Sequence, residues 1–545
     1  MIKKNTLLIL IIITLFGGFL RFYKVDKNPT SLTGDEISFG YAAYSILETG
    51  RDESGRFLPL VIESIGDYKN PLPAYLMVLS FKIFGVSDFA IRFQNALFGT
   101  LFVFFFFFFL KYLTGKDNFA LLGSLFLSIS PWNIFYSRFA YEPLIASFFS
   151  MLGIWFFMKM LDDRKLRFSF LSALFMVLTM YTGFAQRLFI PIFVFAISVF
   201  KIKELLKSKK QTSLFILTFL FLSLPLVYVS LFQGASTRFK MVFIANDINY
   251  VRYVIFGYLN GLIDYIYLFF FWIKRYLNYL QPFFIFSNAL QMVLPSNMGL
   301  GLLYPFEALF LGFGIFEFVK WKNRNKDILL IWLFTGIIPD SITNNEQHAG
   351  RLLHLTPVIF FLTTLGAFSF IKWIFSFKNR LLRFSFVFVF SSLVILNLVF
   401  AFLVFRVHFP YQKSESFDEG LREVVYAVLK YQDKYDKVIF DIRRGVDGPY
   451  MVSNPHMYLL FYSKYDPEKY QTIEKIRDIY QDEPYFSFDK YAFGYINWYR
   501  DSLNKNALLV GSPWSFPDEK VLGDKLLEKI YLSNGKVAFY IVSTR

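Results

Sequence analysis

The stretch MIKKNTLLILIIITLFGGFLRFY, residues 1–23, begins with two lysines and continues as an almost unbroken apolar run. At a rise of about 1.5 Å per residue, a helix of this length crosses the hydrocarbon core of a bilayer. A cleaved signal peptide is the alternative, but no small-x-small cleavage site precedes Arg21 and many more apolar runs follow. The sequence therefore predicts an uncleaved first transmembrane helix with the N-terminus in the cytoplasm.

The composition of the whole chain indicates the same class. Of 545 residues, 55% are hydrophobic, 21% are aromatic and only 18% are charged, which excludes an ordinary soluble globular protein. The formal charge of +16 does not indicate nucleic acid, because the basic residues form short clusters between apolar runs, as membrane topology requires. The absence of Cys and the presence of only 4 His exclude disulfides and thiolate catalysis and leave little for a His-based metal site.

The distribution of Lys and Arg gives a topology, because cytoplasmic connections are enriched in both. The connections expected inside are all basic: Lys111 with Lys116, residues 159–167, 201–210 and 320–326, and residues 372–383. The later connections expected outside are poorer in Lys and Arg for their length: residues 137–143, 181–187, 233–299 and 341–351. We expect about 11 spans, or about 13 if residues 254–273 form a double crossing rather than an interfacial segment. Both counts place the C-terminus outside.

Composition changes abruptly after the last expected span. The sequence predicts a transmembrane domain of residues 1–407, with a first outer loop of residues 24–88, and an extracytoplasmic α/β domain of residues 408–545. LREVVYAVLKYQDKY, from Leu421, predicts an amphipathic helix. DKVIFDI, ALLVGS and KVAFYIVS predict strands.

The first outer loop contains the stretch TGDEISFGYAAY, residues 33–44, with Asp35 and Glu36 side by side. An acidic pair at the start of a helix is commonly only a cap. Other ionisable residues recur in the outer connections, where a carboxylate opposite several cations suits an anionic lipid-phosphate donor and a hydroxyl acceptor. This set comprises Asp67, Lys69, Arg138, Glu142, Arg187, Arg238, Lys240, His348 and Arg351.

Several motifs in order resemble those of a known family. TGDE, ETGRDESGRFLPL, DYKNPL, SPWNIFYSRFAYEP and HAGRLLHLTP resemble the PMT-like bacterial members of the GT-C glycosyltransferases, relatives of protein O-mannosyltransferases and aminoarabinose transferases. The resemblance covers roughly residues 1–407 and is strongest before Pro143. It implies transfer of a sugar from a polyprenyl-phosphate carrier to an acceptor outside the membrane. It also implies that Asp35 is the catalytic base and that Glu142 is a second acidic position.

The sequence departs from the aminoarabinose branch at two places. The metal- and phosphate-binding Glu-Lys-Pro-Pro segment of that branch is replaced by DYKNP, residues 67–71, so a metal role for Asp67 is in doubt. Ser38 stands where the branch has a basic residue three positions after its base. The metal and the cofactor stay unknown, with a divalent cation left open.

The expected mechanism is a single inverting displacement. Asp35 takes the proton of an acceptor hydroxyl as it attacks the anomeric carbon, Glu36 or Glu142 orients the acceptor, and the cations hold the released phosphate. The acceptor, whether protein, lipid or glycan, is not identified. The alternatives are a transporter or flippase for lipid-linked sugars and a non-catalytic subunit, but transporters tend to place ionisable groups at mid-membrane in repeated halves, and no halves repeat here.

Overall fold

The computed structural model describes residues 3–64, 67–232, 242–248, 250–251, 262–290, 299–344, 347–480 and 483–545. Its contacts form two compact units. The helical unit comprises Met1–Tyr23, Asn70–Pro73 and Arg92–Val404. The loop-and-sheet unit comprises Lys24–Lys69, Ala74–Ile91 and Phe405–Arg545. By its contacts, most of the first outer loop thus belongs to the same unit as the C-terminal residues. The expected division into domains at residue 407 rests on composition and stays a prediction.

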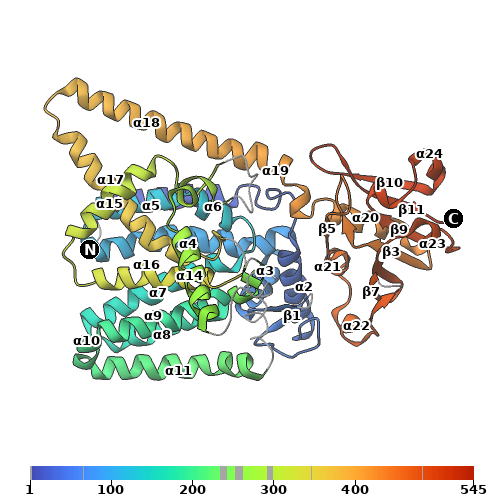
Figure 1. The fold of residues 1–545 in the computed structure, drawn as a ribbon, viewed down its shortest axis with the longest axis horizontal. Helices are drawn as coiled ribbons and strands as arrows, with labels where there is room; N and C mark the ends of the chain where they lie inside the picture. The colour runs from blue at the N-terminus through green and yellow to red at the C-terminus, as the bar shows by residue number, and fades with distance from the viewer. Residues whose placement is uncertain are drawn as a thin grey trace. The chain divides into compact units, whose positions relative to one another are not determined.

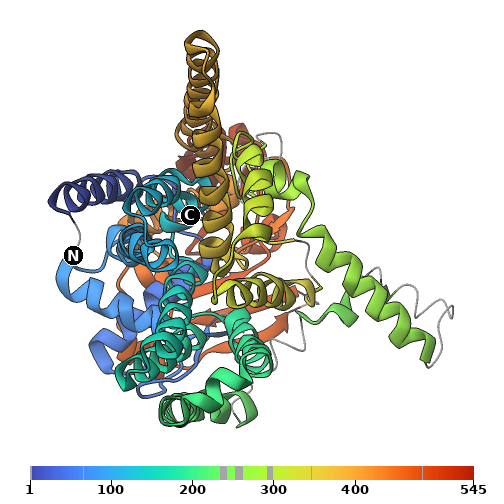
Figure 2. The same cartoon turned by 90° about the vertical axis from the view of Figure 1, so that its left-hand side faces the viewer.

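Long apolar helices build the helical unit, as expected for a mostly α membrane protein, and Figure 1 shows α7, α8, α9 and α11 running side by side. The helices of this unit are α1 (Lys4–Phe22), α4 (Asp88–Thr114, whose first turn lies in the other unit), α5 (Asp117–Ile129), α6 (Pro131–Ser137), α7 (Glu142–Asp163), α8 (Leu166–Thr182), α9 (Phe184–Phe200), α10 (Ile202–Lys207), α11 (Lys209–Phe232), α14 (Leu262–Asn278), α15 (Glu307–Lys320), α16 (Lys326–Ser341), α17 (Thr356–Ser376) and α18 (Arg380–Leu403). Helix α18, drawn in gold, projects from the other helices in Figure 2.

Six helices of the described residues are long and apolar enough to cross a membrane, or seven if the bent pair α5 and α6 forms one span. Helices α8 and α9 are apolar but have only 17 residues each. The multi-pass character is confirmed, whereas the expected count of about 11 to 13 spans requires that shorter helices also cross, and it stays a prediction. The segment 254–273 is described only from Leu262 onward.

The break between α5 and α6 is stabilised by a buried arginine of the first helix. The two helices meet at 57°. Arg21 donates from Nη1 to Ser128 O at 3.0 Å and from Nη2 to Leu127 O at 3.1 Å and to Asn133 Oδ1 at 2.6 Å. The last carbonyls of a helix lack partners within it, so these bonds satisfy groups that would otherwise be costly to bury in an apolar environment.

Helices α15 and α17 pack with their backbones in close approach. A Cβ atom added to Gly314 of α15 would lie 2.0 Å from Leu362 O, and one added to Gly366 of α17 would lie 1.8 Å from Phe310 O. Small residues permit such approach between membrane helices.

The loop-and-sheet unit is built around a seven-stranded sheet with the strand order β10-β11-β9-β3-β8-β7-β6. The central strand β3 pairs in parallel with β8 and β9, and the other pairs are antiparallel. The strands are β3 (Lys437–Asp441), β6 (Ile476–Tyr480), β7 (Glu483–Phe488), β8 (Tyr491–Gly494), β9 (Ala507–Gly511), β10 (Leu526–Tyr531) and β11 (Val537–Ser543). Figure 1 labels most of them. The three expected strands are confirmed. Strands β3 and β9 are apolar because their side chains are buried on both faces of the sheet.

The remaining elements of this unit are short. From the first outer loop come α2 (Gly34–Thr49), the hairpin β1 (Ile62–Ser64) and β2 (Asp67–Lys69), and α3 (Pro71–Phe84), whose first residues lie in the helical unit. From the C-terminal part come α19 (Phe409–Gln412), α20 (Leu421–Tyr431), β4 (Arg443–Arg444), β5 (Met451–Val452), α21 (Pro455–Tyr462), α22 (Pro467–Thr472), α23 (Trp498–Asp501) and α24 (Glu519–Leu522). The amphipathic helix expected from Leu421 is confirmed as α20.

Substitution Gly314→Ala is expected to lower the thermal stability of the purified protein in detergent, because its methyl group would overlap the α17 backbone and overpacking costs about 1–3 kcal/mol. The matched control is Gly312→Ala on the same helix, where an added Cβ meets nothing within 4 Å. Thermal unfolding followed by circular dichroism compares the two variants. Equal unfolding temperatures would contradict the close packing of α15 and α17.

Candidate functional site

The two neighbouring acids of the first outer loop have different roles at the start of α2. Thr33 accepts a hydrogen bond from the Glu36 backbone N–H at 3.3 Å, and Glu36 Oε2 accepts one from the Thr33 backbone N–H at 2.9 Å. This reciprocal pair is a capping box, and it buries Glu36 completely. The interpretation as a helix cap therefore applies to Glu36.

Asp35, by contrast, presents its carboxylate to the outside of the unit. Its side chain is 73% exposed, and Oδ1 accepts a hydrogen bond of 2.9 Å from the Lys69 ammonium group. Lys69 is 4% exposed, lies on strand β2, and places Nζ 4.8 Å from the centre of the Phe39 ring. The Asp35 carboxylate and the Phe39 ring supply the polar and aromatic partners that a buried ammonium group requires.

A buried acid lies behind this pair. Glu53 comes from the same loop and hydrogen-bonds Ser64. Burial raises the pKa of Glu53 from 4.5 to about 7, although the Ser64 hydrogen bond and the charge of Lys69 oppose the rise. Nothing in the sequence distinguishes Glu53 from the other acids of the loop.

The C-terminal residues hold the start of α2. Asp418 Oδ2 accepts a hydrogen bond from the Gly34 backbone N–H at 3.1 Å, and its other oxygen accepts one from Arg444. The Tyr458 hydroxyl donates to Leu32 O at 2.7 Å. Asp418 and Arg444 were missed from the sequence, because nothing along the chain connects them with residues 32–34.

A second polar group lies in the helical unit, at the end of α16. Asp340 accepts hydrogen bonds from Arg351 Nη1 at 3.0 Å, from the Tyr279 hydroxyl at 2.6 Å and from the His348 backbone N–H at 3.3 Å. Arg351 Nη1 also donates to Thr343 Oγ1 at 2.9 Å. Asp340 was missed, although an acid at the end of an apolar run is a signal that could have found it.

His348 is held neutral within this group. Burial, and then the positive charge of Arg351, lower the pKa of His348 to about 4. Its Nδ1 accepts a hydrogen bond from the Gly350 backbone N–H at 3.1 Å, and its ring lies 5.8 Å from that of Tyr141. Of His348 and Arg351, only Arg351 is therefore a cation, and His348 acts as a polar uncharged group.

The other expected arginines differ in their surroundings. Arg138 donates to the carbonyls at the end of α1, from Nη1 to Leu20 O at 2.9 Å and from Nη2 to Tyr23 O at 2.9 Å, which gives it a structural role in capping that helix. The guanidinium of Arg187 stacks 4.6 Å above the Phe184 ring. Its buried Nη2 atom has no hydrogen-bond partner among the described residues.

The remaining expected site residues are Glu142, Arg238, Lys240 and Asp67. Glu142 is the first residue of α7, where an acid interacts favourably with the helix dipole. Arg238 and Lys240 lie outside the described residues, as does the side chain of Asp67. Within the described part of the chain, no three His, Cys, Asp or Glu side chains come together as metal ligands.

The described residues define a class, a polytopic membrane protein with an accessible acid in its first outer loop. Residues 68–228 match the model of the family described as dolichyl-phosphate-mannose-protein mannosyltransferase. An uncharacterized protein of Aquifex aeolicus (strain VF5) is 28% identical over 166 residues, and the alignment covers 30% of this chain and 31% of that protein. The aligned segment thus spans about a third of this relative.

Solved structures show the same fold over almost the whole chain. ArnT from Cupriavidus metallidurans, bound to undecaprenyl phosphate, is similar with a TM-score of 0.56 and 12% identity over 99% of this chain and 98% of ArnT. The archaeal oligosaccharyltransferase AglB from Archaeoglobus fulgidus, in complex with an inhibitory peptide and a dolichol-phosphate, has a TM-score of 0.50 and 12% identity over 81% of this chain and 62% of AglB. The expected resemblance to PMT-like proteins is confirmed over residues 68–228 by the family model, and the fold resembles that of ArnT over almost the whole chain.

Substitution Glu36→Gln is expected to leave both folding and any transfer activity nearly intact, because an amide oxygen can replace the carboxylate in a capping box. Glu36→Ala removes that acceptor and should lower stability by about 1 kcal/mol. Thermal unfolding and transfer assays on both variants provide the measurements. If Glu36→Gln abolished transfer while remaining folded, Glu36 would have a chemical role beyond the cap.

Glu53 should make stability depend on pH. Its pKa is raised in the folded state, so its favourable contribution is present below about pH 4.5 and is lost as the pH rises through about 7. Glu53→Gln should therefore have a free energy of unfolding roughly 2 kcal/mol above that of the parent protein at pH 8.5, seen as a higher unfolding temperature, with little difference at pH 5. The exposed Glu48→Gln serves as control, and a pH-independent effect of Glu53→Gln would contradict the raised pKa.

Proposed function

We propose that this protein is an inverting glycosyltransferase that transfers a sugar from a polyprenyl-phosphate donor to an acceptor hydroxyl on the outer face of the membrane. The observation that carries the proposal is the accessible Asp35 carboxylate, which the buried Lys69 ammonium holds at the start of α2. The match of residues 68–228 to the mannosyltransferase family model supports the reaction class. ArnT and AglB, which share the fold, have been solved with undecaprenyl phosphate and a dolichol-phosphate, respectively, and this supports the class of donor.

The proposed reaction is one displacement. Asp35 removes the proton of the acceptor hydroxyl while the acceptor oxygen forms a bond to the anomeric carbon of the donor. The bond between that carbon and the phosphate oxygen breaks, and polyprenyl phosphate leaves with the electron pair. Because attack and departure take place on opposite faces of the sugar, the configuration inverts.

Cationic side chains would compensate the negative charge of the released phosphate. Lys69 lies beside Asp35, with its Nζ atom 2.9 Å from Asp35 Oδ1. Arg187 and Arg351 stay the predicted phosphate ligands of the helical unit, because a guanidinium group can donate two hydrogen bonds to a phosphate. The proposed orientation has the N-terminus in the cytoplasm and the C-terminal residues outside, in agreement with the basic connections of the sequence.

Asp35→Asn should lower transfer by about 10²–10⁴-fold, the range for a general base, while leaving the fold unchanged. The assay uses purified protein in lipid vesicles with a radiolabelled polyprenyl-phosphate sugar and a cell-envelope extract as acceptor source. It measures both the glycosylated product and the released polyprenyl phosphate.

Two controls define the outcome of this assay. Asp433→Asn changes an acid of the same unit whose side chain is 89% exposed, and it should transfer normally. Full activity in Asp35→Asn would remove the base assignment. Movement of the labelled lipid across the bilayer without a glycosylated product would identify the transporter alternative.

A further inference from the structure

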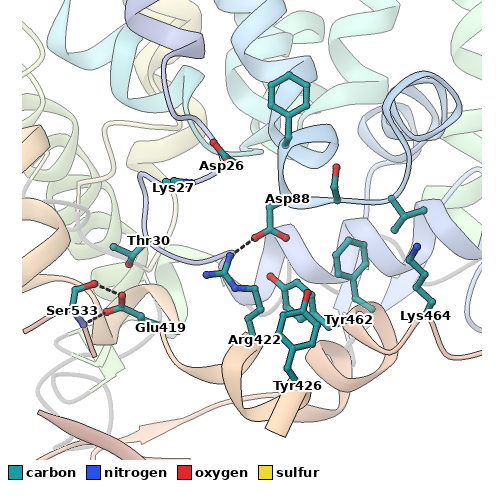
Figure 3. A pocket seen from close by; sticks show the side chains of 14 residues that line it. Asp26, Lys27, Thr30, Asp88, Glu419, Arg422, Tyr426, Tyr462, Lys464 and Ser533 are labelled. Carbon is teal, nitrogen blue, oxygen red and sulfur yellow. Dashed lines mark hydrogen bonds and ion pairs between the residues drawn. The ribbon is translucent and has the colours of Figure 1, made fainter. Parts of the chain in front are cut away.

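A pocket lined by charged and aromatic side chains opens in the loop-and-sheet unit. It has a volume of about 650 Å³, within the range of small-molecule sites. Its walls come from the beginning of the first outer loop, the turn before α4, helices α20 and α21, and the turn that joins β10 to β11. Figure 3 shows the lining side chains, several of which point into the space between these segments.

The charges around this pocket balance. The acids Asp26, Asp88 and Glu419 face the bases Lys27, Arg422 and Lys464. Figure 3 shows two of these groups engaged with neighbours: Arg422 pairs with Asp88 at 2.9 Å, and Glu419 accepts a hydrogen bond from the Ser533 backbone N–H at 3.0 Å. A site with equal numbers of acids and bases, some already paired, does not attract a polyanion such as a phosphorylated ligand.

Aromatic side chains form another part of the wall. Tyr426 is 54% exposed although it is a large aromatic residue, and its ring meets the Tyr462 ring edge-on at 5.8 Å. Phe89 and Phe461 also line the pocket. An aromatic face packs against the apolar C–H face of a sugar ring, while fixed carboxylate, guanidinium and hydroxyl groups exchange hydrogen bonds with its hydroxyls. A neutral polyhydroxyl ligand matches both parts of this wall.

We infer that this pocket binds a neutral saccharide and that the acceptor of the proposed transfer is a glycan. The assignment of the saccharide as the acceptor rests on the proposed function, whereas the binding of a saccharide in the pocket does not. Residues that line the pocket lie close in sequence to the candidate base and to the residue that holds its helix. Thr30 lines the pocket a few residues before Asp35, and Glu419 lines it next to Asp418, which binds the Gly34 backbone N–H.

The test measures binding without catalysis. The full-length protein is placed in lipid nanodiscs free of sugar-based detergent, because a maltoside headgroup would compete for the pocket. Chitobiose and maltose are the neutral disaccharide probes, a neutral Ser/Thr-rich decapeptide is the polypeptide probe, and inorganic phosphate is the anionic probe. Saturation-transfer-difference NMR gives the dissociation constants.

We expect at least one disaccharide to bind and phosphate not to compete. Tyr426→Ala should weaken that binding by roughly three- to tenfold through loss of the ring contact. Tyr426→Phe should retain most of the affinity, because the ring remains. The matched control Tyr499→Ala removes a tyrosine of the same unit that is 87% exposed and does not line the pocket, and its affinity should equal that of the parent protein.

Circular dichroism shows whether Tyr426→Ala is folded, and Lys464→Gln, at an exposed position of the pocket wall, provides a second variant that should weaken binding about threefold. The inference is overturned if no disaccharide binds, or if both pocket variants bind as tightly as the parent. Binding of the peptide alone would identify a polypeptide acceptor and also overturn it. Asp35→Asn should bind the disaccharide normally, so a failed transfer assay and a failed pocket are distinguishable.

Discussion

The hydrogen bond from the Gly34 backbone N–H to Asp418 joins parts of the chain that lie 384 positions apart. It occupies one of the N–H groups that a helix leaves without an internal partner at its start. With the capping box of Thr33 and Glu36, it fixes where α2 begins and thereby the direction of the Asp35 carboxylate. The start of the helix that carries the candidate base is consequently held by Asp418, a residue of the C-terminal part, as well as by its own loop.

Asp35 and Glu36 show how adjacent acids acquire different functions. Successive residues of a helix are turned by about 100° about its axis, so two neighbouring side chains cannot share one environment. Glu36 turns back to the cap and is buried, whereas Asp35 points outward to Lys69. The family resemblance selected Asp35 for its sequence position, and the geometry provides a physical reason for the same choice.

The role of each arginine in the helical unit depends on the partner that it binds. Arg138 and Arg21 both donate to helix carbonyls, because backbone groups without partners are costly where water is scarce. Arg351 instead pairs with Asp340, a residue that the sequence had not suggested. The sequence shows that a cation stands near the surface, but the partner, which decides whether the cation is structural or available, comes from another helix.

The sequence alone determined the class of the protein, its apolar helices, the α/β character of its C-terminal part and the acid on which the candidate site depends. These follow from local composition, hydrophobic periodicity and motif order, which are encoded in neighbouring residues. Only the tertiary structure decided that Lys69 holds Asp35, that Glu36 is a cap, and that Asp418 and Arg444 support α2. The pocket at Arg422 and Tyr426 also required it, because its walls come from segments far apart in the chain, whose meeting depends on side-chain packing and on the pairing of buried charges.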